Sequence, residues 1–283
     1  MPFTANRKNE LLYYTADGLT ATGGVCHAFS TRPGGVSPAP YDSLNLDIRC
    51  GDSDVNIQEN YRRFCAAVGT NVERVVLSQQ RHLCEVRRVT SADAGKGLWR
   101  ERDYTGIDAL ITNEEDLPLT VFSADCGIIL LYDPVQRAIG AVHAGWRGCA
   151  AGILKKTVEE MTAAYGSNPA DLRCAIGPCI GQCCFETDAD VPEAMRAALG
   201  EAAEPYIERR GVKFHIDLAG LNREWLLQSG VLPGHIEVLG LCTACRKDLF
   251  WSHRNMGLER GTQIAMISLL TQFASCIALW FLC

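Results

Sequence analysis

The stretch 118–148, PLTVFSADCGIILLYDPVQRAIGAVHAGWRG, constrains the fold more than any other part of the chain. Three apolar runs in it each end at a polar or glycine-rich break: 120–122, 128–132 and 138–142. Continuous apolar runs of this length, bounded by turn residues, are typical of buried strands. Cys126 and His143 therefore lie where a buried strand gives way to a loop, a position from which scaffolds often present functional side chains.

Composition and charge narrow the class of protein. Of the 283 residues, 47% are hydrophobic and 21% are charged, which is ordinary for a globular protein. The formal net charge of -6 argues against a protein that mainly coats nucleic acid or an anionic membrane, although a local arginine cluster could still bind small anions. The sequence contains no repeat and no obvious linker, so we expect one catalytic domain over 1–272.

The first residues, MPFTANRKNELLYY, have no apolar signal core, so we expect a cytoplasmic protein. In that compartment thiols are reduced by default, so the 14 cysteines are not expected to form a disulfide framework. The apolar tail 273–283 is too short to cross a bilayer, which takes about 20 residues. It could pack on the body or on a second copy of the chain, so a homodimer is left open.

A separate structural zinc site is not favoured by the cysteine spacing. The loop GPCIGQCCFE carries Cys179, Cys183 and Cys184, but a structural site is expected to use two spaced pairs. Only Cys242 and Cys245 have a two-residue spacer.

Two further segments suggest places for an anionic substrate. Alternating apolar residues at 44–48 predict a half-buried strand that places Asn45 and Arg49 on its other face, which is either solvated or a substrate wall. A helix is predicted over 150–165, and its start follows glycines and Arg147. Such a helix start favours an anion, but a tight turn with Arg147 in a salt bridge explains it equally well.

Three residues at strand margins form a candidate metal site: His82, Cys126 and His143. Two imidazoles and one thiolate suit zinc or copper, and three protein ligands leave a fourth position open, as in catalytic zinc sites. No local motif links the three residues. A metal-free cysteine hydrolase, with Cys126 as nucleophile and His143 as base, is the competing interpretation.

Six sequence motifs of this chain resemble those of a known family. In chain order they read YDSLNLDIRCGD, SADCGIILLYDP, AVHAGWRG, GPCIGQCCFE, DLAGLNREWLLQSGV and CTACRKDLFWSHR. Over roughly 11–270 the chain resembles the YfiH family, also called laccase-domain proteins, multicopper polyphenol oxidoreductases or purine nucleoside phosphorylases. The resemblance implies an α+β fold with a mixed sheet core flanked by helices, similar to certain cysteine hydrolases. It also implies that His82, Cys126 and His143 hold a metal, usually zinc.

The resemblance implies several activities. The family is credited with phosphorolysis of adenosine, inosine, guanosine and methylthioadenosine, and with deamination of adenosine. Older names imply copper-dependent polyphenol oxidation, and bacterial members are linked to peptidoglycan precursor editing. A multicopper oxidase needs a large set of His ligands. This chain has only six His, and two of them already belong to the triad. The chain departs from the family at Gln80-Arg81-His82-Leu83, where Gln-Val-His-Gly is usual.

These implications assign roles to individual residues. We expect purine nucleosides and phosphate as the small-molecule partners, and neither nucleic acid nor membrane. Asp125 could orient a ligand His or take a proton, and Asn45 could contact substrate. Guanidinium forks match the oxygens of phosphate, which makes candidates of four arginines: Arg49, Arg147, Arg246 and Arg254.

Overall fold

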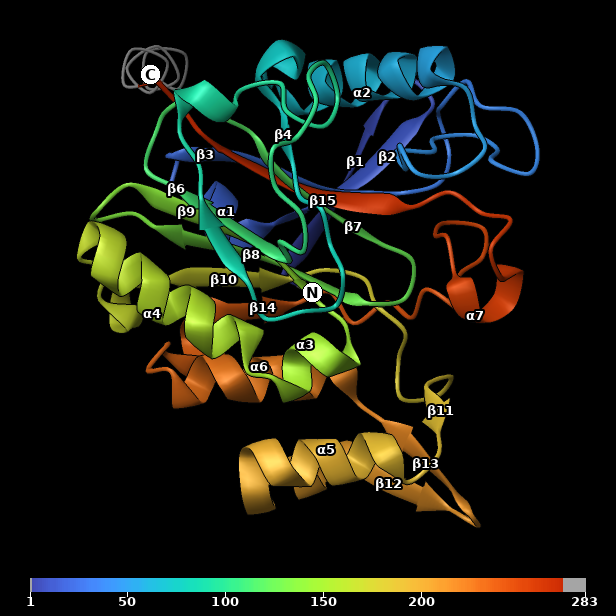
Figure 1. Ribbon diagram of the computed structural model, residues 1–283, viewed down its shortest axis with the longest axis vertical. Coiled ribbons are helices and arrows are strands. Elements are labelled where there is room, and N and C mark those ends of the chain that lie inside the picture. Colours follow the sequence, from blue (N-terminus) through green and yellow to red (C-terminus); the bar gives the residue numbers. More distant parts are fainter. Residues whose placement is uncertain (1, 272–283) are drawn as a thin grey trace.

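The computed structural model describes residues 2–271 and has four layers, with two sheets stacked between two layers of helix (Figure 1). The first sheet has six strands and carries both ends of the described chain. Its order is β1 (Phe3–Lys8), β2 (Leu11–Ala16), β3 (Val25–Ser30), β15 (Gln263–Leu269), β7 (Leu119–Ser123) and β4 (Val76–Leu77).

The second sheet also has six strands and contains the central stretch of the sequence. Its order is β14 (Ile236–Val238), β10 (Arg173–Ile176), β8 (Gly127–Asp133), β9 (Ala138–Ala144), β6 (Ala109–Thr112) and β5 (Val86–Arg88). Every residue of β8 and β9 is buried, as the continuous apolar runs predict.

The pleat of β8 divides its side chains between two cores. Ile128 and Leu130 lie in the core between the two sheets, whereas Ile129 and Leu131 lie in the core beneath the helices. Successive side chains of a strand point to opposite faces, so both faces of β8 must be apolar. A strand of this kind is rigid, which suits it to fix the residues at its ends.

Helices cover the outer face of each sheet. The helix α2 (Asp54–Val68) lies over the first sheet, where Tyr61 and Phe64 pack on the strands. Ser53 caps its start and Gly69, at φ 86°, ends it. The second sheet is covered by α3 (Trp146–Ala150), α4 (Ile153–Tyr165) and α6 (Leu218–Gln228). The short helices α1 (Asp17–Thr20) and α7 (His253–Met256) lie in loops.

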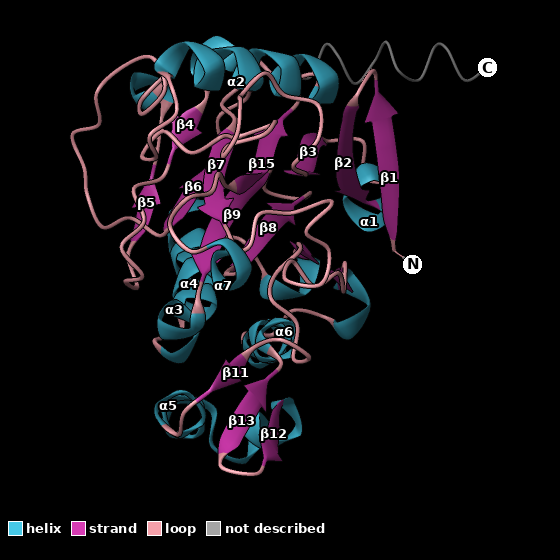
Figure 2. Cartoon of the chain, turned by 90° about the vertical axis from the view of Figure 1, so that its right-hand side faces the viewer, coloured by secondary structure: helices cyan, strands magenta, loops and turns pink. Residues whose placement is uncertain are grey.

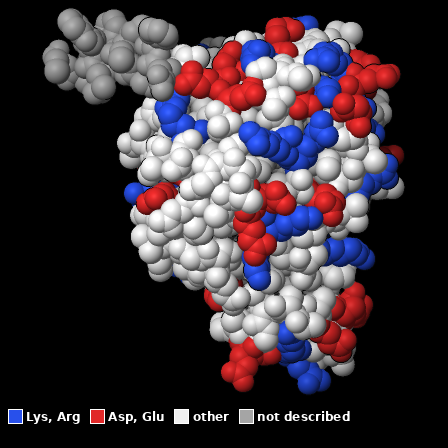
Figure 3. Space-filling view, turned by 60° about the vertical axis from the view of Figure 1, so that its left-hand side comes forward, with Lys and Arg blue, Asp and Glu red and all other residues white. Residues whose placement is uncertain are grey.

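A small extension follows β10. It consists of α5 (Asp190–Leu199) and a three-stranded sheet in the order β11 (Glu186–Thr187), β13 (Lys213–Ile216) and β12 (Ile207–Arg210). Figure 2 shows this unit at the end of the molecule remote from α2. Acidic and basic side chains are interspersed on the face drawn in Figure 3, beside a broad area with few charges.

The expectation of one α+β domain with a mixed sheet core and flanking helices is confirmed. One local prediction is wrong, and one needs a new boundary. The segment 44–48 is an extended loop rather than a strand: Leu44 and Leu46 each donate one backbone N–H to a neighbouring segment, but no continuous ladder forms and the Asn60 side chain takes the Asn45 carbonyl. The helix expected over 150–165 begins at Ile153 as α4, because Gly152 adopts φ 75° and separates it from α3.

The tail 273–283 lies outside the described residues, so its predicted packing is untested. Within 2–271, no helix is both long and apolar enough to span a membrane.

Candidate metal centre

The topology brings His82 and Cys126 to one edge of the molecule. The strands β4 and β7 are parallel neighbours in the first sheet, and each is followed by a segment that crosses to the second sheet. Parallel strands end at the same edge, so the two crossing segments run side by side. One carries His82 and the other carries Cys126.

The strand pairing of β9 adds His143. Ile128 pairs with His143 across the antiparallel β8–β9 ladder, and Cys126 comes just before β8. His143 is 3% exposed, and it faces the layer between the sheets, as Ile139 and Ala141 do. Three segments that are distant in sequence thus converge.

The three side chains have the geometry of a ligand set. The His82 Nε2 atom lies 3.8 Å from the Cys126 Sγ atom, and the two imidazole rings are 4.9 Å apart between centroids. One ligand atom from each of His82, Cys126 and His143 lies within 4.8 Å of the other two. A single metal ion could therefore be shared by all three, as predicted from the sequence.

Asp108, which the sequence analysis missed, holds two of these residues. Its fully buried carboxylate accepts backbone N–H groups from Arg81, His82 and Leu83 at 2.9–3.1 Å. It also lies 2.8 Å from the Nδ1 atom of His143, which leaves Nε2 of that ring free for a metal. A carboxylate behind a ligand His is the usual arrangement in metal sites.

The departure from the family motif at 80–83 does not remove these backbone contacts. Arg81 and Leu83 have exposed side chains, so the altered residues lie outside the ligand set. His82 itself adopts φ 59°, and Asp108 fixes that turn through backbone N–H groups that every residue except proline supplies.

The electrostatics of the triad favour a thiolate. Burial alone would raise the pKa of the Cys126 thiol, but His143 and His82 outweigh it and lower the pKa to about 6. Burial alone would lower the pKa of His143, but Cys126 and Asp108 raise it to about 9. A thiolate is the form of cysteine that binds metal or attacks an electrophile, so both interpretations of Cys126 are served.

Two residues of the triad, His82 and Cys126, line a cavity of about 290 Å³, whereas His143 is buried and is not among the lining residues. The apolar walls of the cavity include Trp146, Ile180 and Phe185, and its polar groups include Arg254 and Arg260. Few convergent polar groups among apolar and aromatic walls are typical of small-molecule sites. The cavity also contains His253, which sequence reasoning did not assign to the site.

Arg260 is the third functional candidate, after Asp108 and His253, that the sequence did not reveal. Burial lowers the pKa of its guanidinium, although Asp47 and Asp125 counteract this effect. Its Nε atom is buried without a hydrogen-bond partner, while Nη1 donates to the Gly261 carbonyl at 3.0 Å. Because Arg260 lines the cavity, its guanidinium could bind an anionic group there.

Of the four arginines predicted to bind phosphate, only Arg254 lines this cavity. Its guanidinium donates to the carbonyls of Cys184 and Glu186, each at 3.0 Å. Arg49 pairs with Asp47, and Arg246 pairs with Asp248. Their predicted phosphate contacts are therefore not supported at this cavity.

Arg147 and Asn45 also lie outside the cavity lining. Arg147 is the second residue of the short helix α3, and its exposed side chain lies over the Trp146 ring at 4.2 Å. Its predicted phosphate contact is therefore not supported at this cavity. Asn45 is fully buried, with its amide bonded to Cys50, Asp52 and the backbone of Asp47. It stabilises its own loop and is not placed to contact a substrate.

Asp125 lines the cavity but does not orient the ligand His. Its carboxylate accepts hydrogen bonds from the hydroxyls of Thr243 and Ser252 and from the backbone N–H of Arg254. The carboxylate beside His143 belongs to Asp108 instead. Asp125 thus fixes the loop that carries Arg254, and its use in proton transfer stays a prediction.

The fold and the triad define an α+β protein with a candidate metal centre of the His–Cys–His type. The model of the family described as multi-copper polyphenol oxidoreductase laccase matches residues 26–270. The chain belongs to this family.

Similar proteins support the assignment. The chain is 34% identical, over 87% of its length and 88% of the relative, to purine nucleoside phosphorylase YlmD of Bacillus subtilis. It is 38% identical to a purine nucleoside phosphorylase of Deinococcus radiodurans, over 87% of its length and 89% of the relative. The solved structure of Bacillus licheniformis hypothetical protein YfiH is 31% identical and matches with a TM-score of 0.88 over 95% of this chain and 99% of that one.

Replacing Asp108 tests its support of the triad. Asp108→Asn is expected to weaken zinc binding by about 10–100-fold, because the ligand His143 loses its carboxylate partner. Competition with a chromophoric chelator measures the affinity. Asp93→Asn, which removes a similarly buried carboxylate paired with Lys96, is the matched control and should bind zinc normally. Unchanged affinity in folded Asp108→Asn would contradict the assignment.

Gly145 gives a steric test of the same site. A Cβ atom at Gly145 would lie 2.8 Å from the Cys126 Sγ atom and 3.1 Å from a carbon of the His82 ring. Gly145 has φ −65°, which alanine adopts freely, so Gly145→Ala changes only the space around the ligands. We expect zinc affinity to fall several-fold with little change in melting temperature. Gly234→Ala, where the added Cβ meets nothing within 4 Å, should leave both unchanged.

The pH dependence of alkylation tests the thiolate. In metal-free protein, Cys126 should become reactive toward iodoacetamide as the pH rises through about 6, far below its ordinary value of 9.0. Labelling of the Cys126 peptide is followed by mass spectrometry. His143→Gln should move the midpoint upward, since the imidazolium that stabilises the thiolate is lost. A wild-type midpoint above pH 8 would show that the ion pair does not form.

Proposed function

We propose that the chain is a metal-dependent purine nucleoside phosphorylase with zinc as the resident metal. The observation that carries the proposal is that His82 and Cys126, which lie within ligand distance of His143, line one cavity together with two arginines. Relatives named purine nucleoside phosphorylase cover most of the chain at 34–38% identity. Adenosine, inosine, guanosine and methylthioadenosine are the proposed substrates.

The cavity offers a complement for each part of a nucleoside and phosphate. Trp146 and Phe185 supply aromatic walls for a purine ring, and Arg260 and Arg254 supply positive charge for phosphate. In phosphorolysis a phosphate oxygen bonds to C1′ of the ribose and the C1′–N9 bond breaks, so the base leaves with its bonding electrons and takes a proton. The products are free purine and ribose 1-phosphate.

Residues of the chain would assist both the attacking phosphate and the leaving purine. Arg260 would hold the phosphate oxygens, since this residue lines the cavity and its guanidinium carries a fixed positive charge. Asp125 or His253 would exchange a proton with the leaving purine, because both line the cavity. Binding both reactants in one cavity would lower the entropic cost of their encounter.

Deamination of adenosine is proposed as a second activity of the same site. A zinc ion bound there would supply the chemistry for this reaction by lowering the pKa of water. Its ligands here would be His82, Cys126 and His143, and Asp108 would keep His143 oriented.

Copper-dependent polyphenol oxidation remains the alternative that the family description names. All six His residues lie in the described part of the chain, and only His82 and His143 among them belong to a potential ligand group there. A multicopper cluster would need more His ligands than these two. A cysteine hydrolase acting in peptidoglycan precursor editing would use Cys126 and His143 without metal.

Product analysis tests the reaction. With zinc-loaded protein, inosine should give hypoxanthine and ribose 1-phosphate only when phosphate is present, and adenosine should give inosine in either case. Free base without phosphate would indicate a hydrolase. Phenol oxidation by copper-loaded protein, with no nucleoside turnover, would support the oxidase. Turnover by metal-free protein that alkylation abolishes would support the cysteine mechanism.

Arg260 gives the sharpest mutational test of the phosphate site. Arg260→Met should raise the KM for phosphate about tenfold or more, because a hydrogen bond to a charged group contributes about 1.5–3 kcal/mol. Deamination should change by less than about threefold, since it uses no phosphate. Arg147→Met is the control, because Arg147 is exposed and does not line the cavity. An equal loss of both activities in Arg260→Met would contradict a phosphate-specific role.

A further inference from the structure

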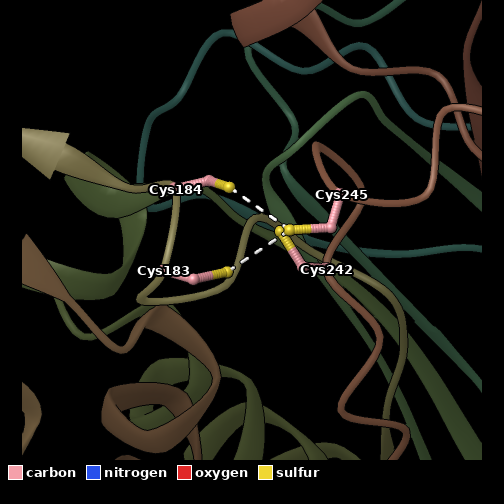
Figure 4. A group of neighbouring side chains, drawn as sticks. All are labelled: Cys183, Cys184, Cys242 and Cys245. Atoms are coloured by element: carbon pink, nitrogen blue, oxygen red, sulfur yellow. Dashed lines mark hydrogen bonds between the residues drawn. The ribbon is translucent and has the colours of Figure 1, made fainter.

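Two loops outside the triad bring four cysteines together. The strands β10 and β14 are parallel neighbours, and the segments after them leave the sheet at the same edge. Their pairing continues past the strand ends through a bridge between Cys179 and Cys242, in which the Thr243 N–H donates to the Cys179 carbonyl. Cys183 and Cys184 follow in one loop and Cys245 in the other. Figure 4 shows the four side chains directed toward one another.

The sulfur atoms have the spacing of a metal site. Cys245 Sγ lies 3.6 Å from Cys183 Sγ and 3.4 Å from Cys184 Sγ, and all four sulfur atoms, including that of Cys242, lie within 4.8 Å of one another. A tetrahedral zinc with Zn–S bonds of about 2.3 Å requires S–S distances of about 3.8 Å. All four cysteines are free thiols, so no disulfide accounts for their proximity.

The surroundings distinguish this cluster from ordinary buried thiols. Cys65, Cys149 and Cys174 are buried, where cysteine behaves as a small apolar residue. Cys183 and Cys245 are exposed, and neither fills an apolar core. The Gly181 N–H donates to Cys242 Sγ at 3.2 Å, a contact that would support a ligand thiolate.

We propose that Cys183, Cys184, Cys242 and Cys245 hold a structural zinc ion, separate from the metal of the triad. Four thiolates repel one another unless a cation lies among them, and soft sulfur ligands in a tetrahedral arrangement select zinc or iron. Four protein ligands leave no open position, so the ion would stabilise rather than catalyse. The proposal does not depend on the reaction performed at the cavity.

The position of the cluster indicates what the ion stabilises. It would fasten the loop 177–186 to the turn 242–245. In the first loop, Phe185 forms part of the cavity wall, and the Cys184 carbonyl accepts a hydrogen bond from the Arg254 guanidinium. In the turn 242–245, the Thr243 hydroxyl donates a hydrogen bond to the Asp125 carboxylate. The zinc would thus hold in register two loops that shape the cavity.

The sequence spacing alone concealed this site. Cys183 and Cys184 are adjacent rather than separated by two residues, and they lie far along the chain from the Cys242 and Cys245 pair. Only the parallel pairing of β10 and β14 brings the two pairs together.

Metal analysis of full-length protein without a polyhistidine tag tests the proposal. Wild-type protein should contain two zinc ions per chain. The double variant Cys183→Ser with Cys245→Ser should keep one, and Cys126→Ala should also keep one. Cys26→Ser, which removes a thiol outside both groups, is the matched control and should keep two. One zinc in the wild type that Cys126→Ala alone removes would overturn the proposal.

X-ray absorption on the Cys126→Ala variant gives a second readout that does not depend on folding of the double variant. The remaining zinc should show four sulfur neighbours at about 2.3 Å and no nitrogen. A nitrogen-containing shell, an iron–sulfur absorption spectrum, or a mass two hydrogens lower than expected for free thiols would each contradict a structural zinc.

Discussion

The buried carboxylate of Asp108 is the interaction on which the candidate site most depends. It receives three backbone N–H groups from the segment that carries His82 and lies against the ring of His143 on β9. A carboxylate without exposed surface is stable only when its oxygens are fully hydrogen bonded, and these four contacts meet that need. One side chain therefore fixes the separation of two proposed metal ligands and orients one of them.

The two stacked sheets supply the rest of the geometry. Cys126 lies in the short crossing from β7 in the first sheet to β8 in the second, and the β8–β9 pairing sets its place beside His143. Both strands are buried on both faces, so the crossing is anchored by apolar packing on either side. Gly145 completes the arrangement, because a larger residue there would meet the sulfur of Cys126.

Much of this could be predicted from the sequence, and the reasons for the rest are physical. The runs around Cys126 and His143 report burial directly, so their strands and their positions at strand ends were predictable. Asp108 was not, since an aspartate before an apolar strand looks the same whether it binds solvent or a histidine. The alternation at 44–48 is real, but periodicity records which side chains are buried and does not identify the backbone's hydrogen-bond partners. Likewise, nothing local distinguishes Arg260 at the cavity from Arg246 in a surface ion pair.

The central claim is that His82, Cys126 and His143 together hold a zinc ion at the cavity. Anomalous diffraction from crystals of untagged protein, recorded on both sides of the zinc absorption edge, tests it most directly. The account predicts a zinc peak in bonding contact with the Nε2 atoms of His82 and His143 and the Sγ atom of Cys126, at about 2.0–2.3 Å. A zinc-supplemented crystal with no peak among these three atoms, and with His143 still bonded to Asp108, would contradict it.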